Sequence, residues 1–249
     1  MNRRFVIASS LLLACSGAFA QANYPEKPIK LIVPYAPGGS ADIAARLISD
    51  AWGKAVGGTM YIENKAGAGG NLGVDFVAKA EGDGYTIGLQ TVSLAINPGL
   101  TPKMPYDTLK DLAPISMVAS SQHVLVTGAN FPAKTAGELV SLVKSKPGKF
   151  QYGSAGAGST FHMSAELFKA VAGVSILHIP YRGSSFANVA VIAKEVDFMF
   201  DNLPPAMGLI NGGKLKPLAV TSAERNPAFQ NVPTMIEYGY QNILVTARF

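Results

Sequence analysis

The sequence predicts an α/β protein in which strand–turn–helix units repeat along the chain. Short apolar runs such as residues 29–33 alternate with segments whose apolar residues recur at helical spacing, such as residues 43–55. The 26 glycines among 249 residues indicate many tight turns. Two glycine-rich turns stand where a strand should pass into a helix. This alternation favours a largely parallel sheet covered by helices.

The first half of the chain predicts three strands and two helices. Ser40 is expected to be the N-cap of the first helix, along which Ile43, Leu47 and Trp52 recur at helical spacing. Residues 97–112 contain several prolines and predict a loop-rich connection. The expected strands are residues 29–34, 60–63 and 85–89, and the expected helices are residues 43–55 and 72–80.

The second half predicts its own complete set of strands and helices. Residues 115–126 are expected to be extended, and Thr135 with Glu138 predicts a capping box that opens a helix as far as Lys144. The other expected strands are residues 150–152, 176–179, 196–200, 216–221 and 243–249, and the other helices are residues 160–172, 185–194 and 205–211. We therefore expect two lobes. Lobe 1 comprises residues 21–122 plus 223–249, and lobe 2 comprises residues 123–222.

The N-terminus has the pattern of a secretory signal peptide, expected to span residues 1–20. Arg3 and Arg4 precede an apolar stretch, and small residues surround a cleavage position before Gln21. Cys15 is the sole cysteine and offers a minor alternative, a lipoprotein processing site. In either case the mature domain carries no disulfide framework, and its expected location is the periplasm.

Charge and composition exclude some classes of function. The chain has 21 Lys and Arg against 16 Asp and Glu, and these charges are dispersed rather than clustered. Nucleic acid is therefore not an expected partner, whereas a mild positive balance is compatible with an anionic ligand. The three histidines show no ligand spacing and no cysteine cluster accompanies them, so neither a metal nor a cofactor is expected.

The two glycine-rich turns are the leading candidates for a binding site. A helix that begins directly after such a turn has free backbone N–H groups and the positive end of its dipole there, which together attract an anion. In open α/β sheets, ligands bind beyond the carboxyl ends of strands, so both turns are expected to face one cleft. The candidate residues are Pro37, Gly38, Gly39 and Ser40 in the first turn, and Ser154, Gly156, Ser159 and Thr160 in the second.

Five further polar residues are candidates for contact with the ligand, and each also has an ordinary structural explanation. Gln90 and Thr91 follow a strand, where loop side chains are often merely solvated. Tyr181 can cover a ligand or pack at an edge of the lobe. Asp201, beside Asn202, ends another strand and can face the cleft or cap the next helix. His162 lies one turn into the second-lobe helix, where a lone histidine is usually structural.

Enzymatic alternatives have weaker support in the sequence. The alternative we retain is a secreted serine hydrolase of small esters or amides. However, Ser154 lacks glycines two positions on either side, and no histidine–acid pair is recognisable for it. Residues 208–214 imitate a phosphate-binding loop, but Leu215 stands where Ser or Thr is required. The glycines of residues 67–73 do not have dinucleotide-binding spacing.

Several motifs together carry a family resemblance. They are Pro37-Gly38-Gly39-Ser40-Ala41-Asp42, Glu63-Asn64-Lys65-Ala66-Gly67-Ala68-Gly69-Gly70, Asp83-Gly84-Tyr85-Thr86, Tyr152-Gly153-Ser154-Ala155-Gly156, Pro180-Tyr181-Arg182-Gly183, Leu218-Ala219-Val220-Thr221 and Val232-Pro233-Thr234. Because it carries these motifs in this order, the chain resembles the periplasmic solute receptors of tripartite tricarboxylate transporters, also called the Bordetella uptake gene family.

The resemblance implies a two-lobed periplasmic binding protein of type II that closes like a Venus flytrap. It implies capture of a small carboxylate by backbone N–H groups, hydroxyls and ordered water, then delivery to a membrane permease, without catalysis and as a monomer. Family members continue for several tens of residues beyond the position of Phe249. The first lobe is therefore expected to be incomplete, and a truncated remnant without ligand binding is the remaining alternative.

Overall fold

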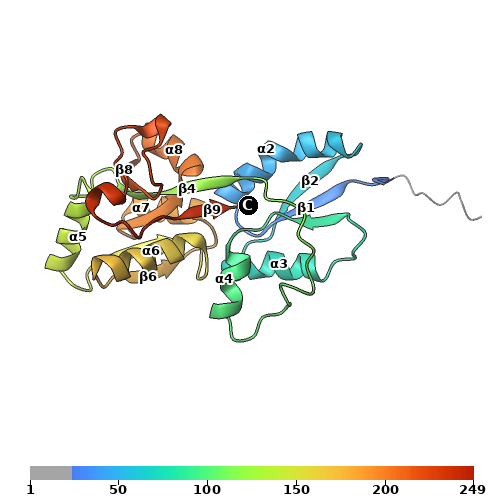
Figure 1. Ribbon diagram of the computed structural model, residues 1–249, viewed down its shortest axis with the longest axis horizontal. Helices are drawn as coiled ribbons and strands as arrows, with labels where there is room; N and C mark the ends of the chain where they lie inside the picture. The colour runs from blue at the N-terminus through green and yellow to red at the C-terminus, as the bar shows by residue number, and fades with distance from the viewer. Residues whose placement is uncertain (1–23) are drawn as a thin grey trace, which may run out of the picture.

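The computed structural model describes residues 24–249, which form two α/β units side by side (Figure 1). The first unit contains a parallel sheet with strand order β2-β1-β3, and the second contains a mixed sheet with strand order β6-β5-β7-β4-β8. This confirms the predicted α/β class. The predicted signal peptide and Cys15 lie outside the described residues.

The first unit follows the predicted order of strands and helices. Its strands are β1 Ile29–Val33, β2 Met60–Asn64 and β3 Thr86–Gly88. Its helices are α2 Ser40–Ala55, the short 3-10 turn η1 Ala68–Gly70, α3 Asn71–Ala78 and α4 Ser93–Leu100. Strand β1 is the central strand, and Leu31, Ile32 and Val33 are almost completely buried.

Helix α4 corrects the prediction of a loop that starts at residue 97. Pro98 lies inside this helix, although proline lacks the N–H group that a helix interior needs. The carbonyl of Leu94, left without that donor, lies 3.5 Å from the hydroxyl of Thr108. A contact distant in sequence therefore compensates for the proline, and the local pattern gave no sign of it.

Helix α2 corrects two further expectations. The N-cap is Gly39, and Ser40 is the first helical residue, because the Ser40 hydroxyl accepts a bond from Asn202 instead of capping the helix. The buried face consists of small residues such as Ala45, whereas Leu47 is 77% exposed. Small side chains allow the helix backbone to approach the sheet closely, so size decides this face rather than hydrophobicity.

The second unit contains the remaining helices and strands. Its strands are β4 Ser120–Gly128, β5 Gln151–Ser154, β6 Leu177–Pro180, β7 Phe198–Asn202 and β8 Leu215–Val220. Its helices are α5 Ala136–Ser145, α6 Thr160–Ala172, α7 Ser184–Ala193 and α8 Leu203–Asn211. Two 3-10 turns follow, η2 Pro227–Phe229 and η3 Ile236–Tyr238, before strand β9 Thr246–Arg248. The predicted cap is confirmed, since Thr135 Oγ1 accepts a bond from the Glu138 N–H at 3.1 Å, but the capping box is not reciprocal, because the Glu138 carboxylate accepts the N–H of Lys134.

The second sheet is buried on both faces. Along β7, Phe198 and Phe200 pack on the face covered by α5 and α6, whereas Met199 packs on the face covered by α7 and α8. This alternation is the two-residue period of a strand. Strand β4 runs antiparallel to both β7 and β8, so the expected parallel arrangement holds for β5, β6 and β7 and for the first sheet.

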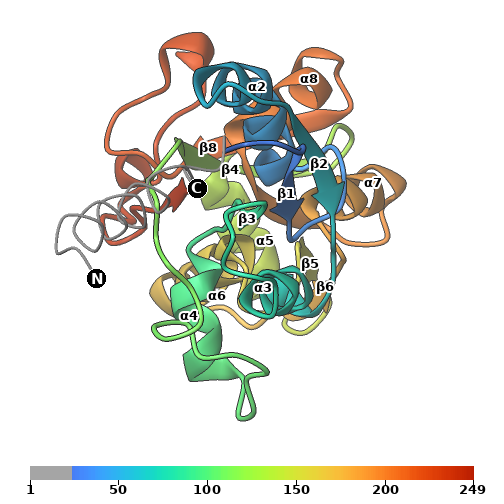
Figure 2. The same cartoon turned by 90° about the vertical axis from the view of Figure 1, so that its right-hand side faces the viewer.

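The two units are connected by segments that lie far apart in the sequence. Strand β9 pairs with the beginning of β4, with Ser120 opposite Arg248, while Ala247 and Phe249 pack in the same core cluster as Leu31. Helices α2 and α8 also contact each other across the boundary (Figure 2). The exact lobe boundaries, at residues 122 and 222, stay a prediction.

Candidate functional site

A small cavity lies between the two units, where β1, β5 and β7 end. Its volume of about 10 Å³ is comparable to the space that one water molecule needs. Residues from both units line it, and none of these side chains is charged: Tyr35, Gly39, Ser40, Ala41, Thr91, Ala155, Thr160, Phe161, Ser184, Asn202 and Phe249.

Four helices begin at this cavity. Ser40, Thr160 and Ser184 are the first residues of α2, α6 and α7, and Asn202 is the N-cap of α8. The first N–H groups of a helix have no partner within the helix, and each N-terminus carries a partial positive charge. The convergence of four such ends therefore produces a site that favours a negative group, without any cationic side chain.

Hydrogen bonds connect the units around this cavity. Asn202 Nδ2 donates to Ser40 Oγ at 2.6 Å, and Ser185 Oγ donates to the carbonyl of Pro37 at 3.0 Å. Within the described chain, Asn202 Oδ1 and Ser184 Oγ are buried without a partner at hydrogen-bonding geometry, although Ser184 lies beside the Asp201 carboxylate. Burying such atoms destabilises the folded protein unless another polar group forms a hydrogen bond with them.

The first glycine turn is held in place by Asp42. Gly38, whose φ of +79° suits glycine, donates its N–H to Asp42 Oδ2 at 3.0 Å. The same carboxylate accepts bonds from Arg46 and Asn64. Burial would raise the pKa of Asp42, but the bonds from Arg46, Gly38 and Asn64 hold this pKa below its ordinary value. The Asp42 carboxylate is therefore ionised, and both of its oxygens accept hydrogen bonds from residues of the first unit.

The wall of the first unit is a network of hydroxyl groups. The Tyr35 hydroxyl lies 3.1 Å from Thr91 Oγ1 and 2.8 Å from Ser93 Oγ. Burial raises the pKa of Tyr35, so this hydroxyl stays neutral. Gln90, the neighbour of Thr91, does not line the cavity, and its Nε2 atom is buried without a partner among the described residues.

Most polar atoms of the second turn are bonded within the second unit. Ser159 is the N-cap of α6, and its hydroxyl donates to the Gly156 carbonyl at 2.6 Å. Ser154 Oγ lies 2.6 Å from His178 Nε2, and His162 Nδ1 accepts the Gly158 N–H at 3.2 Å. The turn thus contributes Ala155, Thr160 and Phe161 to the cavity.

Tyr181 and Asp201 lie behind the cavity rather than on its surface. Tyr181 packs with the cluster that α7 and α8 cover. Asp201 is completely buried, and its carboxylate accepts bonds from Asn188 Nδ2 at 2.6 Å and from the Asn202 N–H at 2.8 Å. Burial raises the pKa of Asp201 to about 6, although these bonds oppose the shift.

The structure therefore brings together part of the predicted set. Gly39, Ser40, Thr91 and Thr160 line one cavity, so the two glycine turns do face each other. The residues that lie beside or behind it are Pro37, Gly38, Gln90, Ser154, Gly156, Ser159, His162, Tyr181 and Asp201. Sequence reasoning missed Tyr35, Ser184 and Phe161. Ser184 follows a strand and a glycine at a helix start, the same pattern as the two turns, and that pattern could have identified it.

The pair formed by Ser154 and His178 does not build a hydrolytic site. Ser154 is completely buried, and no acidic side chain in residues 24–249 hydrogen-bonds to His178. A serine nucleophile needs access to substrate and a base that a third group orients. His178 is partly buried and bonded to the turn, while buried His123 bonds Ser164 through Nδ1 only.

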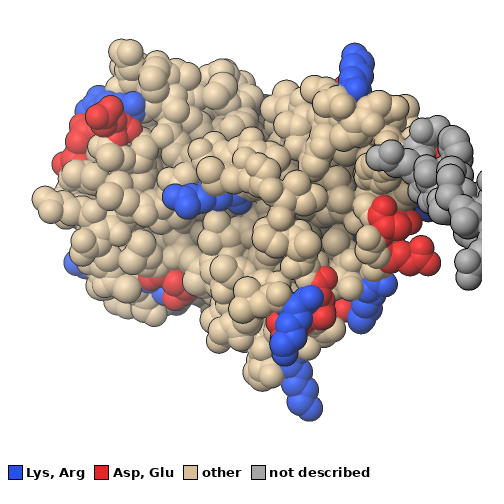
Figure 3. All heavy atoms as spheres, turned by 45° about the vertical axis from the view of Figure 1, so that its right-hand side comes forward, with Lys and Arg blue, Asp and Glu red and all other residues tan. Residues whose placement is uncertain are grey.

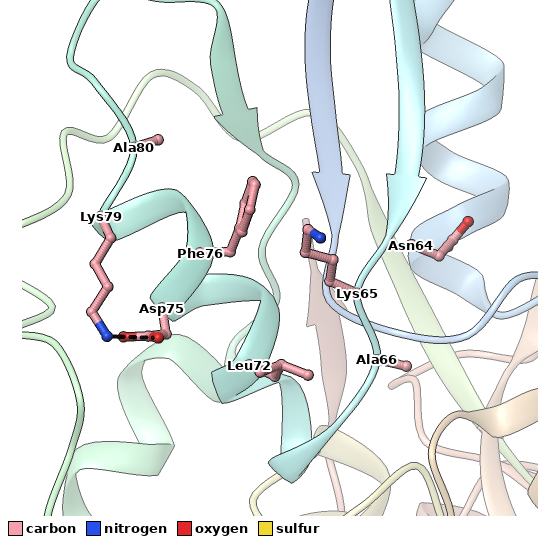
Figure 4. Close-up of a pocket in the computed structure, with 8 residues that line it drawn as sticks. All are labelled: Asn64, Lys65, Ala66, Leu72, Asp75, Phe76, Lys79 and Ala80. Carbon is pink, nitrogen blue, oxygen red and sulfur yellow. Dashed lines mark hydrogen bonds and ion pairs between the residues drawn. The ribbon is translucent and has the colours of Figure 1, made fainter.

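A larger hollow lies on the first unit alone, between the end of β2 and helix α3. It has a volume of about 640 Å³ and is open to solvent. The Lys65 ammonium lies 4.1 Å from the centre of the Phe76 ring, and Lys79 pairs with Asp75 (Figure 4). None of the predicted site residues lines this groove. On the face shown in Figure 3, charged side chains are sparse and scattered.

Two other properties concern the described residues only. Over residues 24–249, no helix is both long and apolar enough to cross a membrane. In the same part of the chain, no three His, Cys, Asp or Glu side chains gather in an arrangement that could hold a metal ion.

The fold and the site together indicate the class of protein to which this chain belongs. Two α/β units that enclose a small polar cavity at the carboxyl ends of their strands form a periplasmic binding protein fold. The family model described as "Tripartite tricarboxylate transporter family receptor" matches residues 44–249, and this chain belongs to that family of solute receptors. Receptors of this family are periplasmic.

Individual relatives agree with this assignment. BugT of Bordetella pertussis is 36% identical over 251 residues, which cover 99% of this chain and 77% of BugT. The solved structure of Rpa4515 from R. palustris with adipate is 33% identical with a TM-score of 0.88, covering 91% of this chain and 76% of that one. MatC from Rhodopseudomonas palustris with bound malate is 32% identical with a TM-score of 0.85, covering 90% and 77%.

Proposed function

We propose that this protein binds a small dicarboxylate between its two units and delivers it to a membrane permease, without catalysing a reaction. The observation that carries the proposal is the convergence of the N-termini of α2, α6, α7 and α8 on one cavity that has no charged side chain in its wall. An anion gains from all four helix ends. The relatives whose structures contain adipate and malate support a ligand with two carboxylate groups.

Binding requires motion in this proposal. A cavity of about 10 Å³ has no room for a dicarboxylate, so the ligand enters a more open arrangement of the units. The units then close because the ligand gains contacts with both of them. We assign the moving lobes to residues 21–122 plus 223–249 and to residues 123–222. The separate sheets support two lobes, and Ala247 and Phe249 support the return of the chain end to the first lobe, whereas Met235 and Ile243 pack in the core of the second unit.

The cellular setting belongs to the same proposal. We expect the N-terminal 20 residues to act as an export signal, and the mature protein to work as a monomer in the periplasm with the permease of a tripartite transporter. The family assignment supports this setting. A serine hydrolase is not favoured, because the buried Ser154 has no access to a substrate.

Charge reversal at Gly39 tests the site. Gly39 has φ −82° and ψ 171°, which any residue adopts, and both Asp and Asn are good N-caps. Gly39→Asp puts a negative charge in the cavity, whereas Gly39→Asn has nearly the same shape without the charge. We expect calorimetry to show malate or adipate binding that falls at least about tenfold further in Gly39→Asp than in Gly39→Asn.

Two results would contradict the proposal. Equal loss of binding in the Asp and Asn variants would mean that anion binding is not decided at this helix end. Consumption of the ligand by the native protein, followed by NMR of the same mixture, would show an enzyme instead of a receptor. The corresponding diamides of both acids serve as uncharged control ligands, and they should not bind.

A further inference from the structure

Two histidines hold the second glycine turn from inside the second unit. His162 on α6 accepts the Gly158 N–H at its Nδ1 atom, over 3.2 Å. His178 on β6 bonds to Ser154 through Nε2, over 2.6 Å. The segment 154–160 is therefore attached to one imidazole ring at Ser154 and to the other at Gly158. The segment contributes Ala155 and Thr160 to the cavity, so its shape determines part of that wall.

The two imidazole rings are stacked on each other. Their centroids are 4.2 Å apart with an angle of 19° between the planes, and His178 also stacks on Tyr152 at 4.8 Å. His178 thus stacks with both Tyr152 and His162. Two positive charges at this separation would repel each other strongly, so the stack does not tolerate protonation of both rings.

The hydrogen bonds specify which ring is sensitive to protons. A backbone N–H can only donate, so His162 Nδ1 must have a free lone pair to accept from Gly158. A proton on Nδ1 turns this acceptor into a donor and breaks the bond. The Ser154 hydroxyl can donate or accept, so its bond with His178 persists in either state.

The charged and titratable groups around the pair come from three elements. Glu166 and Lys169 face it from α6, Tyr152 faces it from β5, and His178 itself lies on β6. Glu166 Oε1 is 4.0 Å from His162 Nε2 and accepts bonds from Tyr152 at 2.5 Å and from Lys169 at 2.7 Å.

These surroundings keep both rings neutral at neutral pH. Burial lowers the pKa of His162, and Lys169 lowers it further while Glu166 opposes the shift. Burial, with help from His162 and Lys169, lowers the pKa of His178 to about 4. Because the pKa is lowered in the folded turn, the latched form is fully stable above the ordinary value of 6.5. It loses that stability as the pH falls below 6.5 and His162 takes up a proton.

We infer that His162 and His178 form a proton-sensitive latch that positions the second glycine turn for ligand binding and releases it in acid. Both are positioning residues, since neither lines the cavity. The effect on ligand affinity rests on the proposed function, whereas the latch itself is a property of the protein alone.

The first experiment uses no ligand. We expect the amide resonances of Gly158 in 15N NMR spectra to titrate with a midpoint below pH 6.5, the ordinary value for histidine, in the native protein. His162→Asn keeps an acceptor near the position of Nδ1 but has no group that protonates, so the Gly158 resonances should then be flat over this range. A flat Gly158 amide in the native protein, or an unchanged titration in the variant, would overturn the latch.

The second experiment measures malate and adipate binding by calorimetry at pH 7.5 and pH 5. We expect the affinity of the native protein to fall about tenfold at the lower pH. The affinity of His162→Asn should fall by at least about twofold less. Protonation of the ligand does not affect the comparison between native protein and variant, because both are measured with the same ligand at the same pH. An equal fall in both proteins would overturn the inference. Failure of both acids to bind at either pH, with a normal Gly158 titration, would contradict the proposed function and leave the latch supported.

Discussion

Asn202 Nδ2 donates a 2.6 Å hydrogen bond to Ser40 Oγ, and this bond joins the end of strand β7 to the first residue of helix α2. The two residues belong to different units and are 162 positions apart in the sequence. Both side chains are buried at the cavity. The bond therefore exists only when the units are closed, and it links closure to the shape of the proposed binding site.

Asn202→Ala should weaken ligand binding by about tenfold. The change removes the bond across the cavity and leaves the buried Ser40 hydroxyl without its partner, which costs about 1–2 kcal/mol. Asn211→Ala is the matched control, because this residue is exposed at the other end of α8. Calorimetry with malate and adipate measures both variants. Equal affinities of the two variants would show that the Asn202–Ser40 bond does not assist closure.

Gly69→Ala should hold the units apart. A Cβ atom at Gly69, in the first unit, would lie 2.1 Å from the carbonyl oxygen of Ala157 in the second. Gly213→Ala is the control, since Gly213 has the same φ of +64° but nothing within 4 Å of an added Cβ. Both changes carry a similar backbone strain. Only Gly69→Ala should enlarge the radius of gyration in small-angle scattering and reduce ligand affinity. Identical scattering from both variants would contradict this expectation.

Asp42→Asn should destabilise the first glycine turn by about 1–3 kcal/mol, because it weakens bonds to Arg46 and to the Gly38 N–H. The pKa of Asp42 is lowered in the folded state, so its contribution is present above the ordinary value of 3.8 and is lost as the pH falls below it. Urea unfolding at pH 7 and pH 3 checks this. Asp50→Asn, on the exposed side of α2, should show little change at either pH. A stability deficit of Asp42→Asn that is as large at pH 3 as at pH 7 would exclude a role for the charge.

Asp201 should give the opposite pH dependence. Burial raises its pKa to about 6, so the native state binds more protons than the unfolded state between the ordinary value of 3.8 and 6. Stability therefore falls as the pH rises through this window, by on the order of 2 kcal/mol. Asp201→Asn cannot ionise and should lack this fall. The measurement is the difference in unfolding free energy between native protein and variant at pH 4 and pH 7. If the difference between native protein and variant is the same at both pH values, folding does not raise the pKa of Asp201, and this prediction is wrong.

Much of the fold was predictable from local patterns. Helix α6 begins and ends at the predicted residues, because Ser159 caps it and apolar residues repeat along it. Strand β1 and the helix cap at Thr135 were also identified correctly. The errors arose where distant contacts prevail over local preference. Thr108 compensates for Pro98 inside α4, and Asn202 takes the hydroxyl of Ser40 that was expected to cap α2.

The site was predictable only in part, for a related reason. Each glycine turn can be recognised in the sequence, because a predicted strand, one or more glycines and a predicted helix start follow one another. Tyr35 and Phe161 gave no such signal, because a buried aromatic side chain looks the same in a core as in a cavity wall. The stacked pair His162–His178 also joins residues of two elements, and spacing along the chain does not reveal it.

The sequence by itself determined that this is an α/β protein with glycine turns suited to an anion, and the family to which it belongs. Periodicity, caps and turn residues act within a few positions, so they can be recognised without coordinates. Only the tertiary structure decided which hydroxyls reach the cavity and which are used within the second unit, and that four helices begin at one point. Those outcomes depend on packing between segments more than a hundred residues apart, such as Ser40 and Asn202, and no local pattern encodes that geometry.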